Sequence, residues 1–165
     1  MPFKTKKVVH VFVDPGKNTG LAVFSSKGRL LAKHIIKTDK TEFEAVCAMR
    51  DNFDIMMNEI KSQYIVKSVT IESVALWSGS EKSVIATSTG KNFLLAYIIG
   101  SYVSICLDFM HQKTIHLITP QKWKGNMSKE ICRRRLEDAL GVEHVPKNEH
   151  VRDAVAMGLD NWDLL

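Results

Sequence analysis

The chain has 165 residues, a length that fits a single domain with one packed core. Hydrophobic residues make up 45% of the sequence and charged residues 25%, as in average soluble globular proteins, which excludes disordered and fibrous classes. The three cysteines, Cys47, Cys106 and Cys132, are far apart and form no CxxC pair. We therefore expect free thiols in a reducing compartment, not a disulfide framework or a zinc cluster.

Neither a signal peptide nor a membrane span is expected. The opening run MPFKTKKVVHVFVD is basic but passes directly into a β-rich pattern, without the apolar stretch and cleavage site of a signal peptide. The longest apolar run, FLLAYIIGSYVSICLDFM, is interrupted by Gly100, Ser101, Ser104 and Asp108, which favours a buried helix over a membrane span. These patterns predict a cytoplasmic protein.

The positive charge is concentrated in one segment. The chain has a formal net charge of +5 and a sequence pI near 9.1, which favours a polyanionic partner. Between Gln121 and Arg135, a single acid, Glu130, stands against six basic residues: Lys122, Lys124, Lys129, Arg133, Arg134 and Arg135. The net charge of this segment, six basic residues less one acid, equals the net charge of the whole chain, +5.

The first part of the sequence predicts three consecutive strands. A β-rich run at 8–14 ends in an acid and is followed by the turn PGKNTG and a second run at 20–26, a pattern typical of a β-hairpin. A further turn signal, Ser26-Lys27-Gly28, leads into a third run at 29–37. We expect a three-stranded meander.

Helices and strands are expected to alternate after this meander. Thr41 is a candidate cap for a helix through about residue 62, because apolar residues recur there at helical spacing. The run VKSVTIES predicts a fourth strand. The Ser- and Gly-rich stretch ALWSGSEKS predicts a mobile loop before a long buried helix at 84–107.

The remaining segments complete an α/β pattern. A short strand at 114–119 is expected to end at Pro120, and the basic segment carries a helix at 128–140. Asn148 is expected to cap the last helix. The order βββαβαβα, with three antiparallel strands followed by crossovers, predicts a five-stranded mixed sheet flanked by helices.

Two acids that end predicted strands are candidates for a common site. Asp14 ends the first strand at a turn that contains glycine, where the backbone can closely approach a phosphate. Glu72 ends the fourth strand, in an otherwise apolar run. Taken singly, Asp14 can equally be an ordinary turn aspartate, and Glu72 can equally be a solvated strand end. Because the first and fourth strands are natural neighbours in this order, the two acids can converge on one metal site.

The last helix carries two further candidates. His150 and Asp153 are three residues apart in NEHVRDAVAMGL and share one face near the helix N-terminus, which favours anions. The alternative is an amphipathic helix whose acids form its solvated face. Phosphodiester hydrolysis by two Mg²⁺ ions about 4 Å apart needs oxygen ligands from separate segments, a need that Asp14, Glu72 and Asp153 meet.

Several segments resemble the RuvC family of Holliday-junction resolvases, which belongs to the RNase H-like superfamily. VFVDPGKNTGLAVF is similar to the first hairpin of that family, IESVALW to its second acidic strand and HVRDAVAMGL to its C-terminal acidic helix. TPQKWKGNMSKEICRRRLEDALG resembles its basic segment, in which Lys124 and Lys129 best match the lysines that contact the junction. The resemblance covers nearly the whole chain.

This resemblance implies a fold, an activity and a set of site residues. It implies one RNase H-like nuclease domain over 1–165, which resolves four-way DNA junctions by paired nicks. Asp14, Glu72, His150 and Asp153 carry over as the metal-binding, catalytic residues for two Mg²⁺ ions per site. The implied assembly is a homodimer in a bacterial cell or a phage-infected host cell. The implied DNA-binding residues are Lys122, Lys124, Lys129, Arg133, Arg134 and Trp77.

Two positions depart from the family pattern. His150 stands where the commonest pattern has aspartate, and imidazole, a softer ligand, suits Mn²⁺ better than Mg²⁺. Mn²⁺ is therefore expected to support activity, with a decline below a pH of about 6.5 if His150 binds as neutral imidazole. Where the family often has an aromatic wedge, this chain has Ala75 and then Trp77. Trp77 either takes that role or packs under its own loop.

Other functions fit parts of the same pattern. The turn DPGKNTG also resembles the first phosphate loop of actin-like and sugar-kinase ATPases, but those enzymes close two duplicated domains around nucleotide. An RNase H-like nuclease acting on RNA, RNA–DNA hybrid or other branched DNA would share the fold. The basic segment and the HxxDA arrangement favour a junction substrate. The presence of all three acids weighs against a non-catalytic junction-binding protein.

Overall fold

Five strands form one mixed sheet, in the order β3-β2-β1-β4-β5, in a computed structural model that describes residues 5–74 and 90–161. β1, β2 and β3 form an antiparallel meander, and β4 lies parallel to both β1 and β5. The strands are β1 (Lys7–Asp14), β2 (Asn18–Ser25), β3 (Leu30–Lys37), β4 (Tyr64–Glu72) and β5 (Ile115–Ile118). The expected meander and the expected neighbourhood of the first and fourth strands are confirmed.

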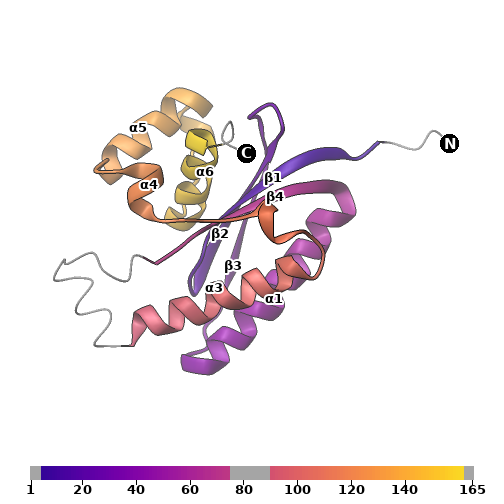
Figure 1. Ribbon diagram of the computed structural model, residues 1–165. Helices are drawn as coiled ribbons and strands as arrows, with labels where there is room; N and C mark the ends of the chain where they lie inside the picture. Colours follow the sequence, from indigo (N-terminus) through magenta and orange to yellow (C-terminus); the bar gives the residue numbers. More distant parts are fainter. Residues whose placement is uncertain (1–4, 75–89, 162–165) are drawn as a thin grey trace.

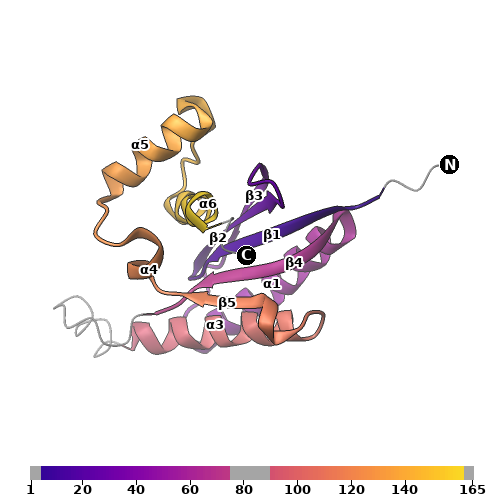
Figure 2. The ribbon, with the colours of Figure 1, turned by 45° about the horizontal axis from the view of Figure 1, so that its top comes forward.

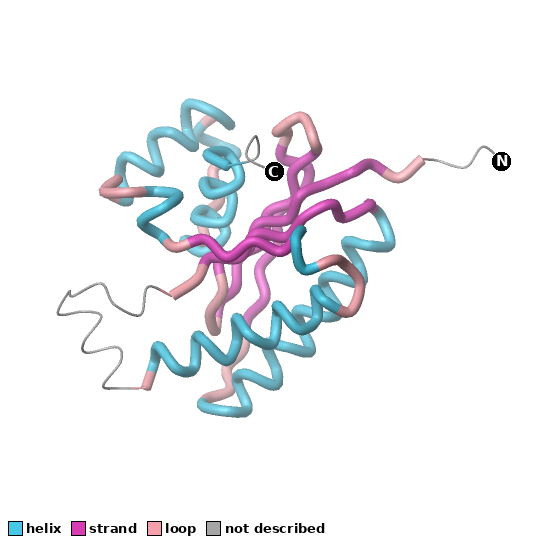
Figure 3. The backbone as a smooth tube through the Cα atoms, in the orientation of Figure 1, coloured by secondary structure: helices cyan, strands magenta, loops and turns pink. Residues whose placement is uncertain are grey.

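Helices cover both faces of this sheet (Figure 1), so that the strands run between two groups of helices (Figure 3). On one face lie α1 (Glu42–Gln63) and α3 (Lys91–Leu107). On the other lie α4 (Pro120–Lys124), α5 (Lys129–Leu140) and α6 (Glu149–Asn161). Two 3-10 turns precede β5 and α6: η1 (Gln112–Thr114) and η2 (Val142–His144). In Figure 2, α6 lies against the sheet and α5 stands outside it.

Strand β1 is buried on both faces, which explains its nearly continuous apolar run. Val9, Val11 and Val13 contribute to the core formed with α1 and α3, whereas Phe12 contributes to the core formed with α6. Successive side chains of a strand point to opposite faces of the sheet. Asp14 therefore ends β1 on the same face as Phe12, under α6.

The core on the α1–α3 face also holds the turn after β1. Phe53 of α1 stacks on Tyr102 of α3, with ring centroids 3.9 Å apart, and both rings are fully buried. The Tyr102 hydroxyl lies 2.9 Å from Thr19 Oγ1 in a hydrogen bond. α3 begins at Lys91, and the first part of the helix expected at 84–107 lies outside the described residues, with the loop before it. None of the described helices has the length and apolarity that spanning a membrane requires.

Polar side chains cap α5 and α6, but not α1. Ser128 and Asn148 each accept a hydrogen bond of 3.3 Å from a backbone N–H in the first turn of the helix that follows. The expected cap by Asn148 is thus confirmed. Thr41 occupies the N-cap position of α1, but its side chain makes no capping hydrogen bond, so a side-chain cap there is wrong. The Thr41 carbonyl instead accepts from the Ala45 N–H.

The three cysteines are free thiols, as expected. Cys47 is exposed, whereas Cys106 and Cys132 are buried. Burial raises the pKa of the Cys106 thiol to about 12, which keeps that side chain in its uncharged, unreactive form.

A glycine lets α6 approach the sheet closely. A Cβ atom built on Gly158 would lie only 2.2 Å from Cε2 of Phe24 on β2, so the position has room for a hydrogen only. Phe24 is fully buried and packs edge-on against Phe12, with ring centroids 5.6 Å apart. The helix therefore rests directly on an aromatic pair of the sheet.

We predict opposite effects for two helical glycine-to-alanine substitutions. Gly158→Ala should lower the free energy of unfolding by on the order of 2 kcal/mol, because its methyl group overlaps the Phe24 ring in a close-packed core. Gly100→Ala in α3 should raise it by about 0.5–1 kcal/mol, because alanine favours the helix. Nothing lies within 4 Å of a Cβ at Gly100. Chemical denaturation measures both, and a stabilised Gly158→Ala variant would contradict this packing.

Candidate active site

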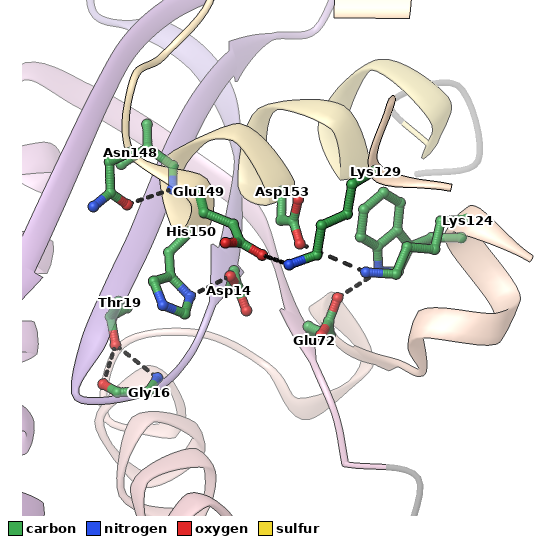
Figure 4. A network of polar contacts seen from close by, with 12 residues as sticks. Asp14, Gly16, Thr19, Glu72, Lys124, Lys129, Asn148, Glu149, His150 and Asp153 are labelled. Carbon is green, nitrogen blue, oxygen red and sulfur yellow. Dashed lines mark hydrogen bonds and ion pairs between the residues drawn. The ribbon is translucent and has the colours of Figure 1, made fainter. Parts of the chain in front are cut away.

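Asp14 and Glu72 lie side by side at one edge of the sheet. Val13 of β1 pairs with Ile71 of the parallel strand β4, so the next residue of each strand is one of the two acids. Val13 and Ile71 belong to the α1–α3 core, which puts both acids on the α6 face. Figure 4 shows the two carboxylates close to one another beneath α6.

A β-bulge gives Glu72 this orientation. Lys67 is an extra residue of β4 that has no partner in β1, and the register of the two strands shifts there. Before the bulge Val66 contacts the α1–α3 core, whereas after it the odd-numbered Val69 belongs to that core. Strict alternation from Val66, with Lys67 counted as an ordinary strand residue, would place Glu72 on the opposite face from Asp14.

The first turn of α6 lies directly on Gly20 of β2. Gly20 pairs with Asp14 across the β1–β2 hairpin, and a Cβ atom built on Gly20 would lie 2.1 Å from the backbone oxygen of His150. Gly20 is not among the glycines with positive φ, so the requirement for glycine is steric. This close contact, together with the Asn148 cap, places His150 beside Asp14.

Asp14 and His150 form a hydrogen-bonded acid–base pair. Asp14 is 7% exposed, and its Oδ2 lies 2.7 Å from Nδ1 of His150. The hydrogen bond to Asp14 raises the pKa of His150. Burial raises the pKa of Asp14, and the hydrogen bond to His150 opposes that shift. Each partner of this pair therefore favours the charged form of the other.

Glu72 is a buried acid with one strong donor. Nε1 of Trp123 donates a hydrogen bond of 2.6 Å to its Oε2. Burial raises the pKa of Glu72 to about 7, and the charge of Asp14 adds to this shift. The indole donor and the charge of Lys124 act in the opposite direction. Added positive charge would therefore favour the ionised form of Glu72 at neutral pH.

Two lysines of the basic segment contact acids of α6. Nζ of Lys124 lies 3.5 Å from Oδ2 of Asp153, and both side chains are about three-quarters buried, with 27% and 24% of their surface exposed. Lys129 bonds Glu149 at the start of the helix. Figure 4 shows both pairs on the side of α6 that faces Glu72.

The carboxylates are chemically suited to bind a divalent cation, although they are not arranged as a preformed metal site. Within residues 5–74 and 90–161, no three His, Cys, Asp or Glu side chains form a group that could hold a metal ion. Each acid instead contacts one protein partner, in the pairs Asp14–His150, Glu72–Trp123 and Asp153–Lys124. Burial and neighbouring acids raise the pKa of both Asp14 and Glu72. A cation between these carboxylates would offset both effects, so the donor set fits one.

The basic residues predicted to bind DNA lie on α4 and α5, next to the acids. Three of them are exposed or partly exposed lysines: Lys122, Lys124 and Lys129. Arg133 and Arg134 form ion pairs of 3.3–3.6 Å with glutamates of α5 itself, which offset part of the positive charge of that helix. Trp77, the sixth candidate, lies outside the described residues.

A charged cleft of about 300 Å³ lies between α5 and α6. Its lining includes Lys124, Lys129, Arg133, Arg152 and Asp153. An apolar pocket of about 360 Å³ lies on the other face of the sheet, between the N-terminal turns of α1 and α3. The charged cleft also contains Glu149, and one of its lining residues, Asp153, is a candidate metal ligand.

Solved structures match the fold, although no protein-family model and no curated protein matches the sequence. RuvC of Thermus thermophilus in complex with a Holliday junction substrate gives a TM-score of 0.66 at 18% identity, over 93% of this chain and 92% of that chain. A second Thermus thermophilus RuvC structure gives 0.64 at 19% identity, with the same coverage. The yeast mitochondrial Holliday junction resolvase Ydc2 gives 0.58 at 14% identity, over 98% of this chain and 80% of that chain. The chain has the RuvC fold.

The RuvC fold confirms the architecture expected from the sequence, an RNase H-like α/β fold with a five-stranded mixed sheet flanked by helices. At 14–19% identity, the match rests on the course of the backbone. The roles of side chains in this RuvC-like chain must therefore be argued from its own geometry.

Two residues of the site were not predicted from the sequence. The sequence pattern places Gly20 at the end of a turn, whereas in the structure it lets α6 touch β2. Trp123 lies within a charged run of the sequence, but it is only 5% exposed and bonds Glu72. A lone large aromatic residue between Lys122 and Lys124 was the available signal, because such a residue in a polar run tends to be a buried anchor.

We predict that Gly20→Ala separates His150 from Asp14. The added methyl group would displace the first turn of α6, so the pKa of His150 should fall back toward its ordinary value of 6.5. An NMR titration of the imidazole measures this pKa. Gly16→Ala is the matched control, because a Cβ there would approach Asn18 O to only 3.4 Å, an ordinary contact. Wild-type titration in Gly20→Ala would contradict the steric role of Gly20.

Proposed function

We propose that the chain is a structure-selective DNA endonuclease that resolves four-way (Holliday) junctions with the help of divalent metal ions. The observation that carries this proposal is that Asp14 of β1, Glu72 of β4, and His150 and Asp153 of α6 lie at one edge of the sheet, beside the basic helices α4 and α5. The fold supports the same reaction, since its structural neighbours include a RuvC in complex with a Holliday junction substrate and a Holliday junction resolvase.

In this proposal, Asp14, Glu72, His150 and Asp153 hold two Mg²⁺ ions. Carboxylate oxygens suit Mg²⁺, and the imidazole of His150 makes Mn²⁺ a further candidate. When bound, such ions supply Lewis-acid stabilisation of the charge that develops on a phosphodiester during hydrolysis. Asp153 is expected to exchange its contact with Lys124 for an ion, which makes Lys124 available to a DNA phosphate.

The protein's own contribution is to position these groups and the DNA. The edge of the sheet fixes Asp14 next to Glu72, and α6 adds His150 and Asp153 from above. Groups held in place before the reaction do not have to be gathered during it, which lowers the barrier. Exposed lysines next to the site, such as Lys129, would contact phosphates of the DNA and fix its register.

Paired nicks require two active sites, so we propose a homodimer in which each chain supplies one site. A symmetric dimer presents its two sites in equivalent orientations. A four-way junction offers two equivalent strands to such a pair, which accounts for symmetric cleavage.

The proposal predicts symmetric, ligatable nicks in a four-way junction with Mg²⁺ or Mn²⁺, and no cleavage of linear duplex or RNA–DNA hybrid. Asp14→Asn should reduce nicking to background yet retain junction binding, since it removes a ligand charge and little volume. Asp51→Asn is the control, because its side chain is 68% exposed on α1. Wild-type nicking by Asp14→Asn would contradict the site. Cleavage of the hybrid alone would indicate an RNase H-like nuclease, and binding without cleavage a junction-binding protein.

A second prediction concerns the salt dependence of junction binding. Binding through phosphates releases counterions, so each lysine that contacts a phosphate contributes about 0.9 to the log-log slope on a duplex scale. Lys124→Ala and Lys129→Ala should each lower the slope by about that amount. Lys27→Ala should not, because Lys27 lies in the β2–β3 turn, at the opposite end of β2 from Asp14. Unchanged slopes in both site variants would place the DNA elsewhere.

A further inference from the structure

The short helix α4 brings an aromatic side chain to the candidate site. β5 pairs with β4 up to Glu72 and Ile118, and Pro120 then starts α4 two residues later. Trp123, near the end of α4, is buried in the core that includes Phe12 and Leu136. Its ring is thereby fixed on the α6 face of the sheet, with the indole nitrogen bonded to Glu72.

The contact between Trp123 and Glu72 is directional. An indole N–H donates and cannot accept, and it requires an acceptor when it is buried. Its acceptor is Oε2 of Glu72, at a distance of 2.6 Å, which is short for a nitrogen donor and fits a bond to a charged carboxylate. A glutamate side chain has three rotatable bonds, so a donor on one oxygen restricts the orientation of the whole carboxylate.

We propose that Trp123 is a positioning residue that orients the Glu72 carboxylate for a divalent cation. The inference rests on the proposed function, because it takes Glu72 as a metal ligand. The bond to Oε2 leaves Oε1 without a bond to the indole and holds the carboxylate beside Asp14, against the repulsion between the two charges. Partners that orient metal ligands in this way typically affect metal affinity by about 10- to 100-fold.

The same helix also contacts a second acid. Lys124, the residue after Trp123, pairs with Asp153 and lies over the Trp123 ring, with its Nζ 4.9 Å from the ring centroid. α4 therefore touches acids from β4 and from α6. The indole contact and the lysine contact differ in kind, because Lys124 is expected to leave Asp153 for DNA, whereas Trp123 stays bonded to Glu72.

Trp123→Phe tests this role, because it keeps an aromatic ring in the core and removes only the donor and part of the ring area. The probe is Mn²⁺, and the EPR signal of the free ion gives its affinity without any nuclease assay. Trp123→Phe should weaken Mn²⁺ binding about tenfold or more. Leu136→Ala is the matched control, because Leu136 is 1% exposed in the same core and should lower stability but not Mn²⁺ affinity.

Two further readouts separate positioning from packing. In a protein carrying Trp77→Phe and Trp162→Phe, the fluorescence of Trp123 should change on addition of Mg²⁺, and Glu72→Gln should abolish that change. On a four-way junction, Trp123→Phe should lower kcat with little change in KM, because its effect is on the metal site and not on DNA binding.

The outcomes distinguish this inference from the proposed function. Wild-type Mn²⁺ affinity in Trp123→Phe, or equal losses of affinity in Trp123→Phe and Leu136→Ala, would overturn the positioning role and leave the nuclease proposal intact. A wild-type protein that binds no Mn²⁺ and nicks no junction would overturn both.

Discussion

The candidate site depends on how closely α6 lies on β2. Gly20 of the strand leaves room for the backbone of His150, and Gly158 of the helix leaves room for the ring of Phe24. Each side of the interface therefore needs one glycine. A side chain at either position would lift the helix, and with it His150 and Asp153. The sheet would keep its second core, formed with α1 and α3. These two steric contacts therefore couple the stability of the α6 face to the geometry of the site.

Close packing of this kind has an electrostatic cost. It gathers acids at a partly desolvated edge, where burial and mutual repulsion favour their protonated forms. The structure offsets this cost with one partner for each acid, an imidazole, an indole and an ammonium group, each supplied by a different residue. A divalent cation would provide the same compensation more strongly, since it carries two charges. Burial and mutual repulsion disfavour the ionised acids in the absence of a cation, and the same two features favour binding of one.

Much of this arrangement could be predicted from the sequence, because it depends on local patterns. Strand periodicity places Asp14 and Glu72 at strand ends, and element order makes their strands neighbours. Contacts between distant segments could not be predicted in this way. Nothing near Gly20 in the sequence indicates that His150 will lie on it, and nothing near Trp123 indicates that its acceptor is Glu72. The ion pairs of the basic segment with α6 were missed because net charge does not reveal which acids approach which lysines.

The orientation of Glu72 depends on a local irregularity of β4. A strict alternation of side chains along β4 places Glu72 on the wrong face, and only the bulge at Lys67 corrects it. The site thus requires a register shift and two close approaches of backbone, at Gly20 and Gly158, which together constrain few residue types. Core positions tolerate exchange among apolar residues of similar volume. The geometry of the site in this chain therefore depends on a few positions, whereas most of the core constrains only the volume of its side chains.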